Sequence, residues 1–433
     1  MTTHSAPSLV EDLRFRGLWH QEVGTGLAGA LSSSKLTAYI GFDPTSDSLH
    51  LGNLMQMCTL RRLQQHGHRP IALAGGGTGM VGDPGGKSEE RVLLSEEQLA
   101  ANLACIRPQL ERFVELGDAD GAGGGGLLLE NSQWLKALGL LEFLRDTGKH
   151  FTVNDMVNKE SVRSRLERPE QGISYTEFSY MLLQAYDFLY LYEHHDCRLQ
   201  LGGSDQFGNI SMGVELVRKR HGAQVHGLTT PLVLKADGSK FGKTEAGTVW
   251  LDASRTSPFA LYQFFLRAED AVVGAYLRYF TFLDHDEIRD LDAAVSSHPE
   301  QRQAQRALAR SVCTLVHGPE ETARVEQAAR SLYSEDITTL DEATLLEVCS
   351  EAPTSDRPRA ELDTGLPIVE ALAATGLVRS KSEARRAVEQ GGVYVNNRRE
   401  PDPERALGRH DLLHGRYLVL RRGRRDYHLV RFV

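Results

Sequence analysis

The feature that most constrains the fold is an alternation of strand-like and helix-like stretches over the first 130 residues. Short apolar runs are typical of buried strands, and longer amphipathic stretches separate them. The strand-like runs are Leu36–Phe42, Pro70–Ala74 and Leu127–Glu130, and the helix-like stretches are Leu54–Gln65 and Asn102–Glu115. This alternation predicts an α/β fold in which crossover helices cover a parallel sheet. Ligands on such sheets bind beyond the carboxyl ends of the strands, where the turn over 42–53 lies.

The chain changes character after residue 250. Helical patterns fill 251–350, a polar stretch with prolines follows, and short helices and strands share the last segment. The later helices are expected over Pro258–Arg267, Gln301–Val316, Pro319–Leu332, Leu366–Gly376 and Lys381–Gln390, and the later strands over Val393–Asn396, Tyr417–Arg421 and Tyr427–Phe432. We therefore expect an α/β domain over 1–250, a helical domain over 251–350, a linker over 351–364 and a small α+β domain over 365–433.

The composition is that of an ordinary globular protein, since 41% of the 433 residues are hydrophobic and 25% are charged. No apolar run is long enough to span a membrane, and residues 1–11 lack the pattern of a secretion signal. We therefore expect a cytoplasmic protein with no membrane partner.

The five cysteines are scattered and form no CxxC pair, which fits reduced thiols and predicts no fixed metal site. A Gly-rich stretch over 117–126 is interpreted as a surface insertion without chemistry.

Charge is unevenly distributed along the chain. The net charge is -9, but residues 365–433 hold 14 Lys and Arg against 8 Asp and Glu, a balance of +6, while the rest of the chain carries -15. A basic module on an acidic body is typical of proteins that bind a polyanion such as RNA. A solvated charged surface has the same composition, so both interpretations stand at this point.

The turn after the first strand carries groups suited to a nucleotide. Its sequence is YIGFDPT over 39–45 and HLGN over 50–53. Pro44 ends the strand, and the amides at the start of the next helix would favour phosphate. Gly52 lets a flat base approach the backbone, and His50 can donate hydrogen bonds to phosphate oxygens. A lone histidine near a helix start is more often a capping or surface residue, so this turn needs a partner segment.

That partner is the segment KFGKT over 240–244. Glycines permit this loop to move, and the ammonium groups of Lys240 and Lys243 can reach pyrophosphate oxygens. A lysine-rich loop is usually only a solvated surface. Together with the turn around His50, it offers a way to hold a triphosphate from two sides.

Two other glycine-rich matches fail on their context. The stretch Gly77–Gly82 fits GxGxxG after the second strand, which suggests a dinucleotide, but Pro84 breaks the helix that should follow. The stretch that ends at Ser88 approaches a P-loop, but Val81 stands where the first glycine is required.

The turn and the lysine loop, in this order, resemble the ATP-handling signatures of class I aminoacyl-tRNA synthetases in their bacterial tyrosyl form. The segments YMLLQAYD over 180–187 and GGSDQFGN over 202–209 resemble the substrate helix and the ribose-binding loop of that family, and 377–396 resembles an S4-type RNA-binding domain. The resemblance covers nearly the whole chain. It implies a Rossmann-like catalytic domain, a helical domain that binds the anticodon arm and an S4-like domain. It also implies a ligase that activates L-tyrosine with ATP and transfers the tyrosyl group to the 3'-terminal adenosine of tRNA(Tyr).

The resemblance further implies a role for each residue that matches a motif. The tyrosine-binding residues would be Tyr39 and Asp187 at the phenol hydroxyl, Asp83, Tyr180 and Gln184 at the ammonium group, and Gln206 near the carboxylate. The ATP-binding residues would be Asp43, His50, Gly52, Gly203, Asp205, Lys240 and Lys243, and the catalytic residues Thr45, His50, Asn53, Lys240, Lys243 and Thr244. RNA phosphates would face Arg379, Lys381, Arg385 and Arg386.

The chemistry of these residues agrees with the implied reaction. Phenylalanine would leave Asp187 and Tyr39 without a partner, because its ring carries no hydroxyl to donate to the carboxylate. The substrate carboxylate is already a nucleophile at neutral pH, so we expect no essential general base and no tightly bound cofactor, with Mg²⁺ accompanying ATP. Asn53 stands where the signature of the family has a second histidine. Its amide donates hydrogen bonds but carries no titrating charge.

Two alternative functions are considered. The first is a tryptophan-type ligase, which is the most similar to a tyrosine ligase, and the second is a catalytically silent RNA-binding protein. A silent protein should have lost His50, Lys240 or Asp187, and all three are present. As in the family, we expect a homodimer formed through the Rossmann-like half, with the region around 140–170 at its interface.

Overall fold

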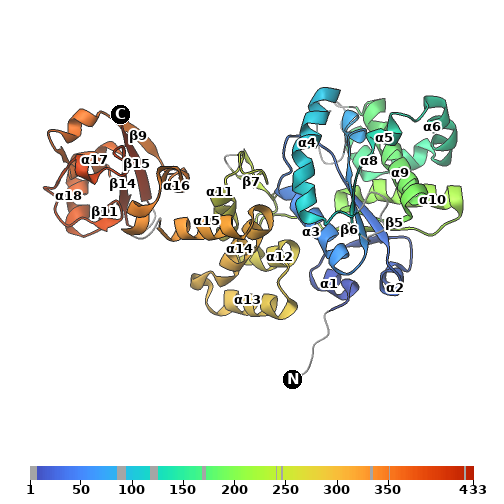
Figure 1. Cartoon of the computed structure of the whole chain (residues 1–433), viewed down its shortest axis with the longest axis horizontal. Coiled ribbons are helices and arrows are strands. Elements are labelled where there is room, and N and C mark those ends of the chain that lie inside the picture. Colours follow the sequence, from blue (N-terminus) through green and yellow to red (C-terminus); the bar gives the residue numbers. More distant parts are fainter. Residues whose placement is uncertain are drawn as a thin grey trace, which may run out of the picture. The chain divides into compact units, whose positions relative to one another are not determined.

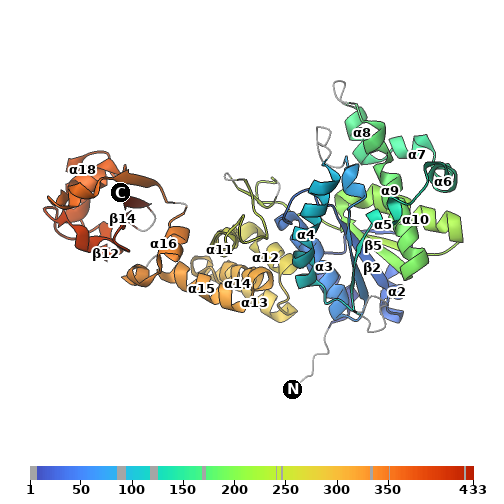
Figure 2. The ribbon, with the colours of Figure 1, turned by 45° about the horizontal axis from the view of Figure 1, so that its top comes forward.

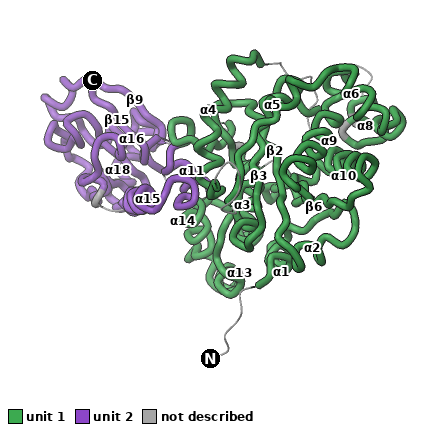
Figure 3. Tube along the Cα trace, turned by 45° about the vertical axis from the view of Figure 1, so that its right-hand side comes forward, with its two compact units in different colours: residues 1–256, 265–312 green, residues 257–264, 313–433 purple. Residues whose placement is uncertain are grey.

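The computed structural model describes residues 7–84, 94–117, 125–167, 172–239, 241–244, 247–331, 335–350, 352–423 and 426–433. The chain divides into two compact units, which Figure 3 colours separately. Unit 1 comprises residues 1–256 and 265–312, and unit 2 comprises residues 257–264 and 313–433. Unit 1 therefore extends past the boundary expected at residue 250.

A six-stranded sheet forms the centre of unit 1, in the order β1-β6-β5-β2-β3-β4. Its strands are Gln21–Val23 (β1), Thr37–Phe42 (β2), Arg69–Ala74 (β3), Leu127–Glu130 (β4), Cys197–Gly203 (β5) and His226–Thr230 (β6). Only β1 is antiparallel to its neighbour, so the predicted parallel sheet is confirmed. Strand β2 pairs with β3 on one side and β5 on the other, and the crevice between the carboxyl ends of β2 and β5 is where such sheets bind ligands.

Helices cover both faces of this sheet (Figure 1). The pair α3 (Leu51–Gln65) and α4 (Glu96–Phe113) lies on one face, and the pair α9 (Tyr175–His195) and α10 (Phe207–His221) lies on the other. The layer under α9 is apolar, with Tyr39, Ile71 and Leu73 of the sheet packed in one cluster with Phe188. The other helices of unit 1 are α1 (Leu9–Phe15), α2 (Leu27–Ser33), α5 (Ser132–Leu135), α6 (Leu140–Asp146), α7 (Val153–Val157), α8 (Glu160–Leu166), α12 (Asp270–Phe280) and α13 (His285–Ser297).

A buried charge cluster joins α12 to the body of unit 1. Arg16, which follows α1, donates to the carbonyl oxygens of Thr281 and Leu283 at 3.1 and 2.7 Å. Arg62 of α3 also donates to the Thr281 carbonyl. The Asp12 carboxylate lies 2.7 Å from Arg16 and 3.5 Å from Arg62 and offsets part of their charge. The two guanidinium groups thus lie where the carbonyl groups at the end of α12 need donors.

Unit 2 combines helices with a five-stranded sheet in the order β12-β11-β14-β15-β9. Its helices are α15 (Pro319–Ser331), α16 (Glu342–Val348), α17 (Ile368–Ala374) and α18 (Lys381–Glu389), and both α11 (Pro258–Leu266) and α14 (Gln303–His317) cross the division between the units. Its strands are β9 (Thr354–Arg357), β11 (Val393–Val395), β12 (Arg398–Arg399), β14 (Tyr417–Arg422) and β15 (Asp426–Phe432), beside a small pair formed by β10 (Leu366–Pro367) and β13 (Ala406–Leu407). The helices and strands predicted for this part are confirmed, with ends shifted by a few residues.

The linker expected over 351–364 is wrong for the described residues of that stretch. Strand β9 pairs in parallel with β15, and Leu362 is buried in the core of the same module. The side chains of β9 alternate between exposed and half-buried, and none of them is apolar. The polar composition of the stretch therefore conceals a strand.

No helix in the described part of the chain is both long enough and apolar enough to cross a bilayer.

Candidate active site

The residues predicted to bind tyrosine lie together with Asp43, predicted to bind ATP, at the carboxyl ends of β2 and β5. Asp43 follows β2, Tyr180 and Asp187 lie on α9, and Gln206 lies in the turn after β5. The helix α9 begins with a Ser174 cap and places its polar residues on the face toward the sheet, where hydrogen bonds join them to the strand ends. The structure thus brings together residues that are far apart in the sequence.

Asp187 is the most deeply buried carboxylate of the site, with 2% of its surface exposed. Its Oδ1 accepts a hydrogen bond from Trp134 Nε1 at 2.7 Å, and its Oδ2 accepts one from Asn131 Nδ2 at 2.9 Å. Burial raises the pKa of Asp187 to about 7, although both donors oppose the shift. The sequence reasoning missed Asn131 and Trp134. Their position directly after β4, at the same sheet edge as Asp43, was the available signal.

Tyr39 presents a hydroxyl group beside this carboxylate. The hydroxyl is buried and has no hydrogen-bond partner among the described residues. Burial, followed by the charge of Asp187, raises the pKa of Tyr39 well above its usual value, so the group stays a phenol. A buried hydroxyl without a partner costs about 1–3 kcal/mol, which a bound polar group would recover.

A hydrogen-bonded chain connects Asp187 to Asp43. Asn131 Nδ2 also donates to Thr78 Oγ1 at 3.0 Å, and Thr78 Oγ1 donates to Asp43 Oδ1 at 2.9 Å. The Tyr180 hydroxyl donates to the other Asp43 oxygen at 3.0 Å. Asp43, assigned to ATP by its motif, is therefore also held by a residue assigned to tyrosine.

The glycine-rich stretch that resembled a dinucleotide motif supports this chain. The Gly77 amide donates to Asn131 Oδ1 at 2.7 Å. A Cβ at Gly75 would lie 2.0 Å from Asp43 Oδ1, so the strand end must carry a glycine to admit that carboxylate. These glycines make room for the polar network of the site.

A second network holds the residues assigned to the substrate amino and carboxylate groups. Gln206 Nε2 donates to Asp83 Oδ2 at 2.6 Å. Asn209 of α10, which the sequence reasoning also missed, donates to Gln206 Oε1 and Gln184 Oε1, both at 3.1 Å. Burial, and then the charge of Asp83, raise the pKa of Asp205 nearby. Several carboxylates that converge in this way favour a cation such as an ammonium group.

The turn around His50 forms the amino end of α3. His50 is the N-cap residue, and its Nδ1 accepts a hydrogen bond from the Gly52 amide at 3.0 Å. This bond assigns the proton of the neutral ring to Nε2. A Cβ at Gly52 would lie 2.7 Å from the ring of His50, so the ring itself requires the glycine. Asn53 Oδ1 accepts from the His50 amide at 3.2 Å, which gives Asn53 a capping role.

The lysine loop lies directly beside this turn. The Leu51 amide donates to the Val249 carbonyl at 3.1 Å, and the Val249 amide donates to the Gly242 carbonyl at 2.8 Å. The turn around His50 and the lysine loop are thus hydrogen-bonded to the same residue, Val249. Lys240 lies outside the described residues. Lys243 and Thr244 form the short strand β7 (Lys243–Thr244), which pairs with β8 (Gly247–Thr248).

The remaining predicted residues occupy simpler positions. Thr45 is exposed in the turn after β2, and a Cβ at Gly203 would lie 2.5 Å from Asp205 Oδ1. The four residues assigned to RNA are exposed at the start of α18 or within it. Two of them pair with acids of the same module, Lys381 with Glu370 and Arg385 with Glu404.

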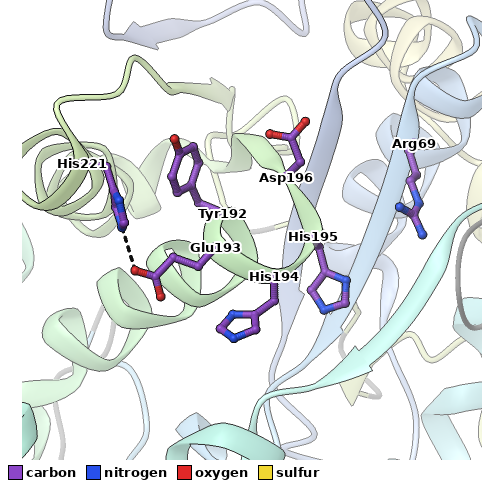
Figure 4. A pocket seen from close by; sticks show the side chains of 7 residues that line it. All are labelled: Arg69, Tyr192, Glu193, His194, His195, Asp196 and His221. Atoms are coloured by element: carbon purple, nitrogen blue, oxygen red, sulfur yellow. Dashed lines mark hydrogen bonds and ion pairs between the residues drawn. The ribbon is translucent and has the colours of Figure 1, made fainter.

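A cavity of about 760 Å³ lies near the amino ends of the strands, opposite to the carboxyl ends where the site residues lie (Figure 4). Its lining residues are Arg69, Tyr192, Glu193, His194, His195, Asp196 and His221. They come from the end of α9, the end of α10 and the start of β3, away from the strand ends where Asp43 and Asp187 lie. Within the described ranges, no three His, Cys, Asp or Glu residues are arranged to hold a metal ion.

Comparison with known proteins gives consistent matches. The family model described as tRNA synthetases class I (W and Y) matches residues 31–334, and a model of the tyrosine--tRNA ligase SYY-like C-terminal domain matches 350–430. The tyrosine--tRNA ligase of Roseiflexus castenholzii is 51% identical, covering 98% of this chain and all of its own. That of Bacillus caldotenax is 48% identical, covering 98% of this chain and 99% of its own.

Solved structures agree with these matches. A C-terminally truncated mitochondrial tyrosyl-tRNA synthetase from Aspergillus nidulans is 34% identical, with a TM-score of 0.68, and the match covers 76% of this chain and 95% of that one. A tryptophanyl-tRNA synthetase from Plasmodium falciparum is similar at 13% identity and a TM-score of 0.50, which shows a shared fold alone.

Proposed function

The chain belongs to the tyrosyl members of the class I tRNA synthetases and is a tyrosine–tRNA ligase, and from this premise we propose which of its residues carry the reaction. The observation that carries the proposal is the buried pair of Asp187 and Tyr39. One is a carboxylate fixed by two donors, and the other is a hydroxyl without a described partner. The phenol of tyrosine would donate to Asp187 and accept from Tyr39.

The two steps follow from the layout of the site. A carboxylate oxygen of tyrosine would attack the α-phosphorus of ATP, and the bond from that phosphorus to pyrophosphate would break. His50, Thr45, Lys240 and Lys243 would stabilise the charge that develops on pyrophosphate, and Mg²⁺ would enter with ATP. A ribose hydroxyl of the terminal adenosine of the tRNA would then attack the tyrosyl carbonyl and release AMP.

Amino-acid-dependent exchange of pyrophosphate into ATP tests the assignment directly. The purified protein should support exchange with tyrosine and not with tryptophan or phenylalanine, because only a phenol satisfies both buried groups. Equal exchange with tryptophan would overturn the assignment of the pocket.

The lysine loop should act on rate more than on tyrosine binding. Lys243→Ala and Lys240→Ala are each expected to lower the activation rate by about 100- to 1,000-fold, because they act on charge that develops in the transition state. The affinity for tyrosine, measured by fluorescence titration, should stay within about threefold. Lys235→Ala, upstream in the same loop, is the matched control. A loss of tyrosine affinity with an unchanged rate would give the loop another role.

Tyrosine binding should also depend on pH near neutrality. The phenol needs an ionised acceptor, and the pKa of Asp187 is raised to about 7. The dissociation constant for tyrosine is therefore expected to rise below pH 7, by up to about tenfold per pH unit. The raised pKa also means that the native protein holds this proton when the unfolded chain has lost it. As the pH rises from about 4 to 7, the contribution of Asp187 to the free energy of unfolding therefore falls, and above pH 7 it is constant. A flat binding profile from pH 5 to pH 8 would contradict this assignment.

We also propose that the chain forms a homodimer through unit 1. Figure 2 shows α6, α7 and α8 together at one side of this unit. Large apolar side chains are exposed there, including Leu140, Leu141, Val153, Leu166 and Tyr175, and Leu141 exposes 81% of its surface. Monomers rarely leave such a patch uncovered.

Light scattering at micromolar concentration tests the dimer. The protein should have twice the mass of one chain, and the variant that combines Leu141→Asp with Val153→Asp should be a monomer. Leu346→Asp, an exposed leucine of unit 2, is the control and should leave the mass unchanged. A monomeric unmodified protein would count against the proposal.

A further inference from the structure

Phe241 stands between the two lysines of the loop, yet its side chain enters the core. The residue is 8% exposed, whereas Asp237, Gly238 and Ser239 just before it are exposed. Its ring stacks on Phe280 with centroids 5.1 Å apart and lies 4.9 Å from the ring of Tyr276. Phe265 closes the cluster at 6.0 Å. We call Phe265, Tyr276 and Phe280 the aromatic box.

The box also holds the start of the loop. The Tyr276 hydroxyl donates to the Leu234 carbonyl at 2.8 Å. On the far side of Phe241, the Gly242 carbonyl accepts from Val249, and a Cβ at Gly242 would lie 3.1 Å from Leu51. Gly238 and Gly242 have φ angles of +77° and +78°, which other residues adopt at a cost. The loop is therefore fixed at three points, and glycines supply the bends between them.

The box and the turn around His50 are both connected to α3. Tyr276 and Phe280 belong to α12, and the carbonyl groups at its end accept from Arg62 of α3. The amino end of α3 is capped by His50. A change in the position of Phe241 relative to the box is thus also a change relative to the turn.

We propose that Phe241 is a positioning residue for tyrosine activation. Its ring, seated in the aromatic box, sets where the loop presents Lys240 and Lys243 to the departing pyrophosphate. This inference rests on the proposed function of the two lysines. Phe241 acts through the loop, since its side chain carries no polar group to offer to a substrate.

The test is a comparison of substitutions that empty or preserve the box. Phe241→Ala is expected to lower the rate of ATP–pyrophosphate exchange by about 100-fold, because a misplacement near 1 Å has an effect of this size. The dissociation constant for tyrosine should stay within about twofold, which a general loss of structure would not allow. Phe241→Met refills the box with a flexible apolar side chain and should recover most of the rate. Tyr276→Phe removes only the bond to Leu234 and should lower the rate about fivefold.

Two further measurements separate the possible failures. Trypsin should cleave Phe241→Ala within the loop faster than it cleaves the unmodified protein. In the Phe241→Ala background, Lys243→Ala should have much less effect than alone, because the lysine is already displaced. If Lys243→Ala alone leaves the rate unchanged, the role of the lysines is wrong. If Lys243→Ala lowers the rate but Phe241→Ala and Tyr276→Phe do not, only the positioning role is overturned.

Discussion

Replacement of Asp187 by alanine is expected to weaken tyrosine activation by about 30- to 1,000-fold, which corresponds to about 2–4 kcal/mol for a buried charged hydrogen bond. The carboxylate is the acceptor that the site offers to the phenol. Its loss also leaves the amide of Asn131 and the indole N–H of Trp134 without their partner. The measurement is the tyrosine dependence of ATP–pyrophosphate exchange.

A control on the same helix and a variant of one of the two donors isolate this effect. Glu193→Ala removes a carboxylate that pairs with His221 at the surface and should leave exchange unchanged. Trp134→Phe keeps a ring to stack on Tyr190 but loses the donor to Asp187, and should weaken activation about tenfold. Unchanged kinetics in Asp187→Ala would remove the phenol from this part of the site.

Removal of residues 352–433 is expected to separate the two steps of the reaction. The residues proposed for tyrosine and ATP all precede position 245, so exchange should stay within about twofold of that of the full chain. Binding of tRNA should weaken, and its log–log dependence on salt should flatten by about 3 to 4 if the four basic residues of α18 and its start each contact one phosphate. The cut falls after residue 351, before β9, because β9 belongs to the sheet of this module.

A point variant checks the same conclusion in the full chain. Arg379→Ala combined with Arg386→Ala removes two exposed charges and should flatten the salt dependence by about 1.5 to 2. Arg409→Ala is the matched control, because Arg409 is exposed in the same module but pairs with Asp363. Circular dichroism should confirm that the shortened chain is folded. If that chain charges tRNA as well as the full protein does, the positive balance of the module is only a solvated surface.

The sequence predicted what local patterns determine. Strands β2 and β3 are apolar and mostly buried, and β4 is a half-buried run of leucines that ends in Glu130. Helix α9 carries its polar residues at helical spacing, so these elements could be predicted. Strands β1 and β9 were missed because they are short edge strands with polar residues. Asn131, Trp134 and Asn209 were missed for another reason. Their contacts depend on which strands become neighbours, and strand order is set by the packing of the whole sheet.

The motifs also identified residues of the site without the contacts that explain them. Gly52 was expected to admit a base, yet the ring of His50 already requires a glycine there. The motif implied that Asn53 is a catalytic residue, and in the structure its side chain accepts a hydrogen bond from the His50 amide. A motif places a residue type at a position, whereas the structure shows which neighbour requires it.

Arg16 and Arg62, which bind the carbonyl groups at the end of α12, determine where the chain can be cut. A fragment that stopped at residue 250 would keep Arg16 and Arg62 but lose the carbonyl groups of Thr281 and Leu283 that accept from them. Two guanidinium groups would then share one carboxylate in an apolar interior, a situation that costs several kcal/mol. The shortest fragment of the enzyme that folds by itself therefore includes α12 and α13 together with the central sheet. Hydrogen exchange should show the amides of α12 opening together with the central sheet, as one cooperative unit.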